Sequence, residues 1–188
     1  MDTTKIKPCH IFVAVSLVAN MLLVVALGSA AHKRDMHWGN VEHMLAQRIA
    51  VLEVEHFITG RQPWRNTAEI RGYAELIVDS ATEFKLPPKL VARVAIAESA
   101  LNHRAVGDGG KSHGILQLQE FWVKEIPFLR NKQDLYRAHL NIRAGAWVLR
   151  HYADLCGEDH MSYLACFNGG PKPNAQARAY AARVAGGA

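Results

Sequence analysis

The sequence has few of the features that mark nucleic-acid-binding proteins. The chain of 188 residues carries a formal net charge of +5, yet its basic residues are dispersed, and no run of them exceeds the pair Lys33-Arg34. A basic surface favours polyanions such as nucleic acid, anionic lipid or an anionic cell wall. Because no recognised nucleic-acid-binding motif is present, we expect no nucleic-acid partner.

Metal-binding patterns are missing as well. The three cysteines, Cys9, Cys156 and Cys166, do not have the CxxC spacing of zinc ligands. His103 and His113 flank a glycine-rich loop, but no helical HExxH motif or third ligand accompanies them. We therefore expect no metal site and no cofactor.

Strand-like alternation of apolar and polar residues is absent too, which predicts an all-α fold. We find no low-complexity tract and no convincing internal repeat. An apolar content of 49% is ordinary for a globular protein and allows a buried core. The chain length leaves room for one main domain and an appendage.

What the sequence does contain begins with an uncharged run from Ile11 to Ala31. Its length suits a bilayer span of about 20 residues. Two interpretations are open: a transmembrane signal anchor that stays in the chain, or a signal peptide cut after Ala30 or Ala31. The run is longer than the roughly 7–15 residues of a signal-peptide core, which favours the anchor. With Asn20 in mid-span, it is only moderately hydrophobic.

The sequence divides into four parts. Residues 1–10 form a short polar N-terminus, and residues 11–31 form the apolar segment. Residues 35–63 are expected to contain an amphipathic connecting helix, and residues 66–186 the main domain. The apolar face of the connecting helix is predicted to consist of Val41, Leu45, Ile49 and Leu52.

Helical patterns fill the main domain. One helix is predicted to begin at Asn66, a good N-cap, and proline at Pro87-Pro88 breaks it and starts the next. Later helices are expected over residues 115–124, 135–156, 159–167 and 174–184.

The helix after Pro88 carries the candidate catalytic acid, Glu98. It is the only acidic side chain within residues 91–101, and its helical neighbours include the apolar Val94 and Leu101. Desolvation in such surroundings disfavours the charged form and raises the pKa of a carboxyl group. A proton retained near neutral pH is what a general acid requires.

Five short motifs follow one another in this domain. They read Glu98-Ser99, Asn102, Gly114-Ile115-Leu116-Gln117-Leu118, Asn141-Ile142-Arg143-Ala144-Gly145 and Phe167-Asn168-Gly169-Gly170-Pro171. Each alone is weak, but in this order and at these spacings they resemble the soluble lytic transglycosylase (SLT) domain, which is akin to goose-type lysozymes. The resemblance covers residues 68–184 and implies a lysozyme-like helical fold.

The resemblance also implies an activity on the glycan strands of peptidoglycan. In this family one glutamate protonates the glycosidic oxygen between N-acetylmuramic acid and N-acetylglucosamine. It then removes a proton from the muramyl 6-hydroxyl, which closes a 1,6-anhydro ring. By position Glu98 takes this role, while Asn141 and Gly145 are expected to be structural. The substrate-binding residues are expected to be Ser99, Gln117, Phe167, Asn168 and Tyr180.

The chain departs from the family pattern at Phe167, where the family usually has tyrosine. The change removes a hydroxyl that could hydrogen-bond the catalytic carboxyl. Loss of one such bond is worth about 1–3 kcal/mol, which would slow the reaction without abolishing it. The role could instead pass to Tyr163 or Tyr180.

Two alternatives to a lytic transglycosylase are open. Asp108 lies in the loop expected to face the cleft and could position a water molecule, which would make the enzyme a hydrolytic muramidase. The other alternative is a catalytically silent wall-binding module of an envelope complex, with Phe167 as a sign of decay. The intact pair Glu98 and Gln117 favours the enzyme.

The expected substrate sets the expected location. We expect a cytoplasmic N-terminus, residues 11–31 in the inner membrane and the catalytic domain in the periplasm, or a secreted periplasmic protein if the segment is cleaved. In that oxidising compartment Cys156 and Cys166 could pair, the alternative being two buried thiols. A weakly hydrophobic segment before a small muralytic domain resembles the signal-arrest-release endolysins of phages. A role in a secretion or conjugation machine, or in wall remodelling, is equally open, and partners in an envelope or lysis complex are unknown.

Overall fold

The computed structural model describes residue 21 and residues 39–186. The chain divides into two units, Met1–Gln47 and Arg48–Ala188. In the first unit, residues 39–47 are helical. The span predicted over residues 11–31 lies outside the described residues, apart from Met21. Within residue 21 and residues 39–186, no helix combines the length and the apolar character that a membrane crossing needs.

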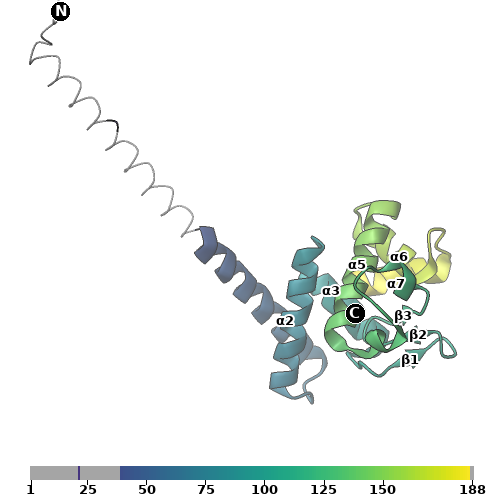
Figure 1. Cartoon of the computed structure of the whole chain (residues 1–188), viewed down its shortest axis with the longest axis horizontal. Helices are drawn as coiled ribbons and strands as arrows, with labels where there is room; N and C mark the ends of the chain where they lie inside the picture. The colour runs from purple at the N-terminus through teal and green to yellow at the C-terminus, as the bar shows by residue number, and fades with distance from the viewer. Residues whose placement is uncertain (1–20, 22–38, 187–188) are drawn as a thin grey trace, which may run out of the picture. The chain divides into compact units, whose positions relative to one another are not determined.

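The second unit is mostly helical (Figure 1). Residues 48–61 are helical. The elements that follow are α2 (Thr67–Glu83), α3 (Pro88–Ser99), β1 (Val106–Gly107), β2 (Ser112–His113), β3 (Leu118–Gln119), α4 (Trp122–Glu125), the 3-10 helix η1 (Lys132–Tyr136), α5 (Ala138–Cys156), α6 (His160–Gly169) and α7 (Ala175–Gly186).

Local sequence explains where α2 and α3 begin. The Asn66 side chain accepts hydrogen bonds from the backbone N–H groups of Ala68, at 2.8 Å, and Glu69, at 3.4 Å. These bonds satisfy donors that the first turn of a helix leaves free. Pro88 occupies the first turn of α3, where a missing N–H costs nothing. Both starting points agree with the sequence prediction.

The core gathers around α5, which contacts α2 and α6, while α7 contacts α6 and α3. The predicted helix over residues 135–156 is interrupted, because Arg137 is extended (ψ 115°) between η1 and α5. Helical spacing on α5 places one continuous apolar face toward its neighbours. The buried residues of that face include Ile142, Ala146, Leu149 and Ala153.

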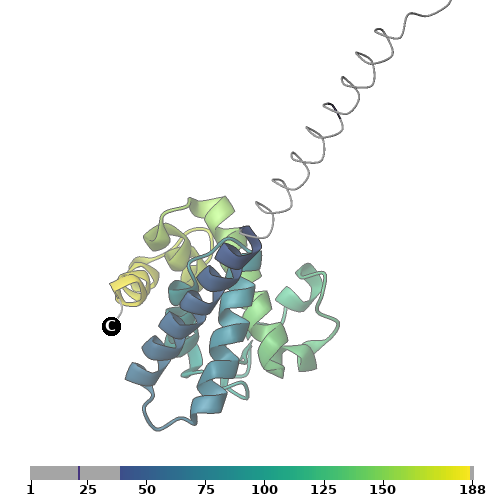
Figure 2. The ribbon, with the colours of Figure 1, turned by 90° about the vertical axis from the view of Figure 1, so that its left-hand side faces the viewer.

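The helix at residues 48–61 buries a different face from the predicted one. Of the four residues that the prediction placed on the apolar face, Ile49 and Leu52 are 57% and 53% exposed here, while in the first unit Leu45 is 58% exposed and Val41 is half-buried. The buried side chains are instead Val51, Val54 and Ile58. Figure 2 shows residues 48–61 alongside α2, and Glu55 accepts a 2.7 Å hydrogen bond from Arg71 of α2. Since apolar residues occupy two sides of this helix, periodicity alone could not decide which side would be buried.

A small antiparallel sheet stands where the sequence predicted loop and helix. Its strands pair in the order β1-β2-β3, with His113 opposite both Val106 and Leu118. The prediction of a purely α fold is wrong here, and so is the helix over residues 115–124, of which α4 alone is helical. Strands of two residues are too short to show alternation. Positive φ at Gly114 (76°) and Gln117 (47°) is incompatible with a right-handed helix.

Candidate active site

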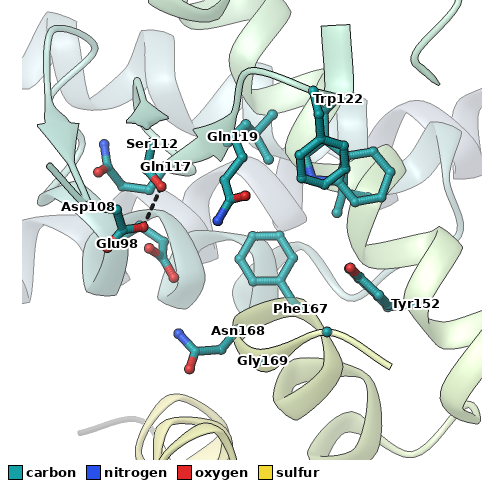
Figure 3. Close-up of a pocket in the computed structure, with 14 residues that line it drawn as sticks. Glu98, Asp108, Ser112, Gln117, Gln119, Trp122, Tyr152, Phe167, Asn168 and Gly169 are labelled. Atoms are coloured by element: carbon teal, nitrogen blue, oxygen red, sulfur yellow. Dashed lines mark hydrogen bonds between the residues drawn. The ribbon is translucent and has the colours of Figure 1, made fainter. Parts of the chain in front are cut away.

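A cleft with a volume of about 540 Å³ lies in the second unit, between the sheet, α3, α5 and α6 (Figure 3). Its size is within the range of small-molecule and saccharide sites. The lining residues are Glu98, Asp108, Ser112, Gln117, Leu118, Gln119, Phe121, Trp122, Val148, Tyr152, Phe167, Asn168, Gly169 and Gly170.

The cleft has two chemically different ends, with Phe167 and Gln119 between them (Figure 3). We call the first the polar end, and it consists of Glu98, Asp108, Ser112 and Gln117. We call the second the aromatic end, and it consists of Phe121, Trp122 and Tyr152. The ring centroids of Phe121 and Trp122 lie 4.7 Å apart, and those of Trp122 and Tyr152 lie 6.0 Å apart.

Glu98 reaches the cleft from the last turn of α3. The helix ends sharply, because Ala100 and Leu101 both adopt left-handed backbone, with φ of 53° and 61°. Ser99 ties this end to the loop beyond β2: its hydroxyl donates to the Ile115 carbonyl at 2.9 Å. The same hydroxyl accepts from the Asn102 N–H at 3.1 Å. Ser99 therefore positions Glu98 without lining the cleft, and its binding to substrate stays a prediction.

The carboxyl group of Glu98 has a specific partner on α7. The Tyr180 hydroxyl donates to Glu98 Oε1 at 2.5 Å, and Tyr180 is only 7% exposed. Burial, followed by the charge of Glu98, raises the pKa of Tyr180 well above its ordinary value, so the phenol keeps its proton. The buried hydroxyl of Tyr163 has no hydrogen-bond partner within the described chain. Of the two tyrosines that could replace the hydroxyl missing at Phe167, Tyr180 contacts Glu98.

The surroundings of Glu98 raise the pKa of its carboxyl group, which is the direction that favours a proton donor. Burial is the largest influence and raises the pKa of Glu98, because desolvation disfavours the carboxylate. The hydrogen bond from Tyr180 acts in the opposite direction, as does the positive charge of Arg183, while the negative charge of Asp108 adds to the rise. The net effect is a raised pKa, as the apolar neighbours of Glu98 in the sequence predicted.

Asp108 is fixed at the polar end by the turn between β1 and β2. Its backbone is left-handed, with φ of 50°. Its carboxylate accepts a hydrogen bond from the hydroxyl of Ser112, at 2.5 Å, and Ser112 is 2% exposed (Figure 3). The structure thus brings Asp108 to the same cleft as Glu98.

Gln117 is held from both ends of its amide. Its Nε2 donates to the Gly114 carbonyl at 2.8 Å. Its Oε1 lies against Gly107, where a Cβ atom would come within 2.3 Å of it. The Gln117 side chain can occupy this place because residue 107 has no Cβ atom.

Asn141 of α5 fixes the loop that carries Gln117. The side chain is 0% exposed, accepts from the Leu116 N–H at 2.7 Å and donates to the carbonyls of His113 and Leu135 at 3.1 and 2.8 Å. Gly145, one turn later, makes room for Leu116, because a Cβ there would lie 2.3 Å from Leu116 Cγ. Both residues hold structure together, in line with the sequence prediction.

The far wall of the cleft comes from the end of α6. Phe167 lies half-buried between the two ends, and Asn168 is exposed beside it. A disulfide joins Cys166, directly before Phe167, to Cys156 at the end of α5. It links the two helices that carry Phe167 and Tyr152.

The sequence predicted a common site for five residues that line the cleft, Glu98, Asp108, Gln117, Phe167 and Asn168. It did not predict several other lining residues. Ser112 and Gln119 belong to strands that were not predicted. Tyr152 gave no signal, because helical spacing does not say which part of a buried face borders a cavity. Trp122 is buried and also lines the cleft.

The described part of the chain has no group of three or more His, Cys, Asp or Glu side chains arranged to hold a metal ion. His113 is 1% exposed and its Nδ1 lies 2.9 Å from the Tyr136 hydroxyl. Burial, with a smaller effect of Lys132, lowers the pKa of His113, so its imidazole is neutral.

A half-buried carboxyl group with a raised pKa, placed in a cleft of a mostly helical domain, is the arrangement that lysozyme-like enzymes use to cleave glycans. The family model of the transglycosylase SLT domain matches residues 75–186, more than half of the chain, and the chain belongs to this family. Membership implies peptidoglycan degradation of the lytic-transglycosylase type, on glycan strands. The match includes both ends of the cleft and Tyr180. No curated protein matches the chain.

Proposed function

We propose that the second unit cleaves the β-1,4 bond between N-acetylmuramic acid and N-acetylglucosamine in peptidoglycan, with Glu98 as the single acid and base. One observation carries the proposal. Glu98 lies in the cleft with its pKa raised by burial, and a phenol donates to its carboxyl group. The first feature suits a proton donor, and the second suits the carboxylate that remains after proton transfer.

The reaction needs two proton transfers at one carboxyl group. In the first, Glu98 gives its proton to the glycosidic oxygen, the bond from that oxygen to C1 of the muramyl residue breaks, and N-acetylglucosamine leaves with a free 4-hydroxyl. In the second, the Glu98 carboxylate takes the proton of the muramyl 6-hydroxyl, and the oxygen of that hydroxyl forms a bond to C1 of the same sugar. The product carries a 1,6-anhydro ring, Glu98 is protonated again, and no water is consumed.

The remaining cleft residues divide between orientation and contact area. Gln117 and Asn168 offer amide groups to sugar hydroxyls and acetamido groups near Glu98. The aromatic end offers rings against which the apolar faces of sugars pack. Phe167 supplies a ring between the two ends but no hydroxyl, and Tyr180 supplies the phenol contact to Glu98 from α7.

A hydrolytic muramidase is the second candidate, because of one observation. Asp108 is held by Ser112 in the same cleft as Glu98 and raises its pKa through its charge. A carboxylate so fixed could accept a proton from water that attacks C1, as in glycosidases with two carboxyl groups. The product would then have an ordinary reducing end.

We further propose that the domain works outside the cytoplasm, in the periplasm, as its substrate requires. The disulfide between Cys156 and Cys166 supports this location, since disulfides persist in oxidising compartments. Anchoring in the inner membrane and the signal-arrest-release interpretation rest on residues 11–31 alone and stay predictions.

The test is digestion of purified sacculi by the full-length chain, followed by mass analysis of the released muropeptides. We expect products with 1,6-anhydro-muramyl ends. Reducing ends, one water heavier, would establish the muramidase and contradict the transglycosylase. Binding to sacculi without any release would contradict both and would establish a silent wall-binding module.

A further inference from the structure

A second side chain of α7 lies next to the phenol that contacts Glu98. Arg183 follows Tyr180 by three residues and shares its side of the helix. The guanidinium carbon lies 5.6 Å from the centroid of the Tyr180 ring. This distance is within the roughly 6 Å over which a cation is attracted to the face of an aromatic ring. Arg183 is exposed, whereas the ring below it is buried.

The position of α7 against α3 is fixed by contacts beyond the Tyr180 hydroxyl. Arg93 of α3 donates a hydrogen bond through Nη1 to the Ala185 carbonyl near the end of α7. Ala181 and Val184, on either side of Arg183, are 0% and 2% exposed. These contacts fix the backbone of α7, which carries Tyr180 and Arg183, against α3, which carries Glu98.

Charges from two different elements act on Glu98 in opposite directions. From the turn between β1 and β2, the Asp108 carboxylate, which accepts from Ser112, favours the protonated acid. From α7, the Tyr180 hydroxyl and the Arg183 guanidinium favour the carboxylate. The other neighbours of Glu98 in the cleft, Ser112 and Gln117, do not titrate.

A group that must first donate and then accept a proton needs both influences. Burial alone would leave Glu98 a poor base after the first step, because the desolvated carboxylate is costly. Catalysis by one group in both directions works best when its pKa stays near the working pH. A fixed positive charge close to the carboxyl group limits how far burial disfavours the carboxylate.

We propose that Arg183 is a positioning residue of the proposed reaction: it holds the Tyr180 ring so that its hydroxyl stays on Glu98, and it supports the carboxylate that Glu98 becomes after the first proton transfer. The inference rests on the proposed function of Glu98. It adds no proton carrier to the reaction.

The direct test follows the carboxyl carbon of Glu98 by 13C NMR during a pH titration of the full-length chain. Glu98→Gln identifies the signal. We expect Arg183→Gln to raise the titration midpoint, Arg183→Lys to leave it near that of the wild type, and Asp108→Asn to lower it. The matched control is Arg178→Gln on the same helix, whose guanidinium donates to the Pro173 carbonyl at 2.5 Å rather than facing Tyr180. An unmoved midpoint in Arg183→Gln would overturn the proposal.

The pH dependence of muropeptide release gives the second readout. Because the protonated acid starts the reaction, the alkaline limb reports the ionisation of Glu98. We expect Arg183→Gln to move this limb to higher pH and to lower the maximal rate about two- to fivefold, the range of a ring–cation contact near the surface. High salt should shrink the displacement, since Arg183 is exposed. A lower rate with an unmoved limb would mean a merely structural role and would overturn the proposal.

The two tests separate this inference from the proposed function. If the wild type releases nothing from sacculi, the proposed function fails, yet the NMR titration still shows whether Arg183 acts on Glu98. If the wild type releases anhydro products and Arg183→Gln matches it in both titration and rate profile, the function stands and the inference fails.

Discussion

The two ends of the cleft are built in different ways. The polar end depends on a short segment between α3 and α4, with left-handed backbone at Asp108, Gly114 and Gln117 and side chains bonded to backbone groups. The aromatic end depends on regular helices, with Tyr152 on α5 and Trp122 on α4. Proton transfer requires atoms held at fixed positions, whereas packing against a sugar ring requires mainly area. The difference therefore predicts that equal damage at the two ends will have unequal consequences.

The largest effect on stability is expected from Asn141→Ala, which removes the support of the polar end. It removes the side-chain partner of three backbone groups, the Leu116 N–H and the carbonyls of His113 and Leu135. We expect the free energy of unfolding to fall by about 3 kcal/mol or more. The melting temperature should drop by about 6–12 °C in a thermal unfolding experiment. A drop of less than about 2 °C would mean that the stability of the polar end does not depend on its hydrogen bonds to α5.

The next effect concerns the phenol at the polar end. Tyr180→Phe removes the hydrogen bond to Glu98, so we expect the maximal rate of muropeptide release to fall about 10- to 100-fold, with little change in KM. Tyr163→Phe is the matched control, because its hydroxyl makes no hydrogen bond within the described chain. Equal rates for the two variants would remove Tyr180 from the mechanism.

A smaller effect is expected at the aromatic end. Phe121 is 51% exposed, so Phe121→Ala should leave the fold intact. Loss of its ring should raise KM about two- to tenfold with an unchanged maximal rate, since an aromatic contact is worth about 0.5–1.5 kcal/mol. Phe121→Tyr keeps the ring and should match the wild type in initial-rate measurements on sacculi. A lowered maximal rate with unchanged KM would erase the contrast between the ends.

The smallest effect is on stability and comes from Glu98→Gln. Because the pKa of Glu98 in the folded state is raised above its value of 4.5 in the unfolded chain, the carboxyl group stabilises the fold below that value and loses this contribution as pH rises through the folded pKa. Glutamine does not ionise. At pH 7 the variant should therefore melt above the wild type, and the gap should narrow toward pH 4. A gap that is the same at both pH values would show that burial does not perturb Glu98.

The same contrast explains how much the sequence could predict. The apolar neighbours of Glu98 on α3 predicted the raised pKa of its carboxyl group, because local helical spacing determines which side chains surround it. The five motifs, through their resemblance to the SLT domain, predicted that Gln117 and Asn168 would lie near Glu98 in one cleft. The choice between Tyr163 and Tyr180 could not be made from the sequence, since the contact from Tyr180 joins residues 82 positions apart.

Other features escaped prediction for physical reasons. The strands of the small sheet have two residues each, too few to show an alternation of apolar and polar residues. Ser112 reaches the cleft because β2 pairs with its neighbouring strands. At residues 48–61 both sides of the helix carry apolar residues, and packing against α2 decided in favour of Val51 and Val54.

The central claim is that Glu98 alone transfers the protons of the reaction. The most direct measurement compares the wild type, Glu98→Gln and Glu75→Gln, an exposed carboxylate on α2, in the rate of muropeptide release from sacculi. We predict that Glu98→Gln falls by about 10²–10⁴-fold, the contribution of a positioned acid or base, while Glu75→Gln matches the wild type. A rate for Glu98→Gln within about threefold of the wild type would contradict the account.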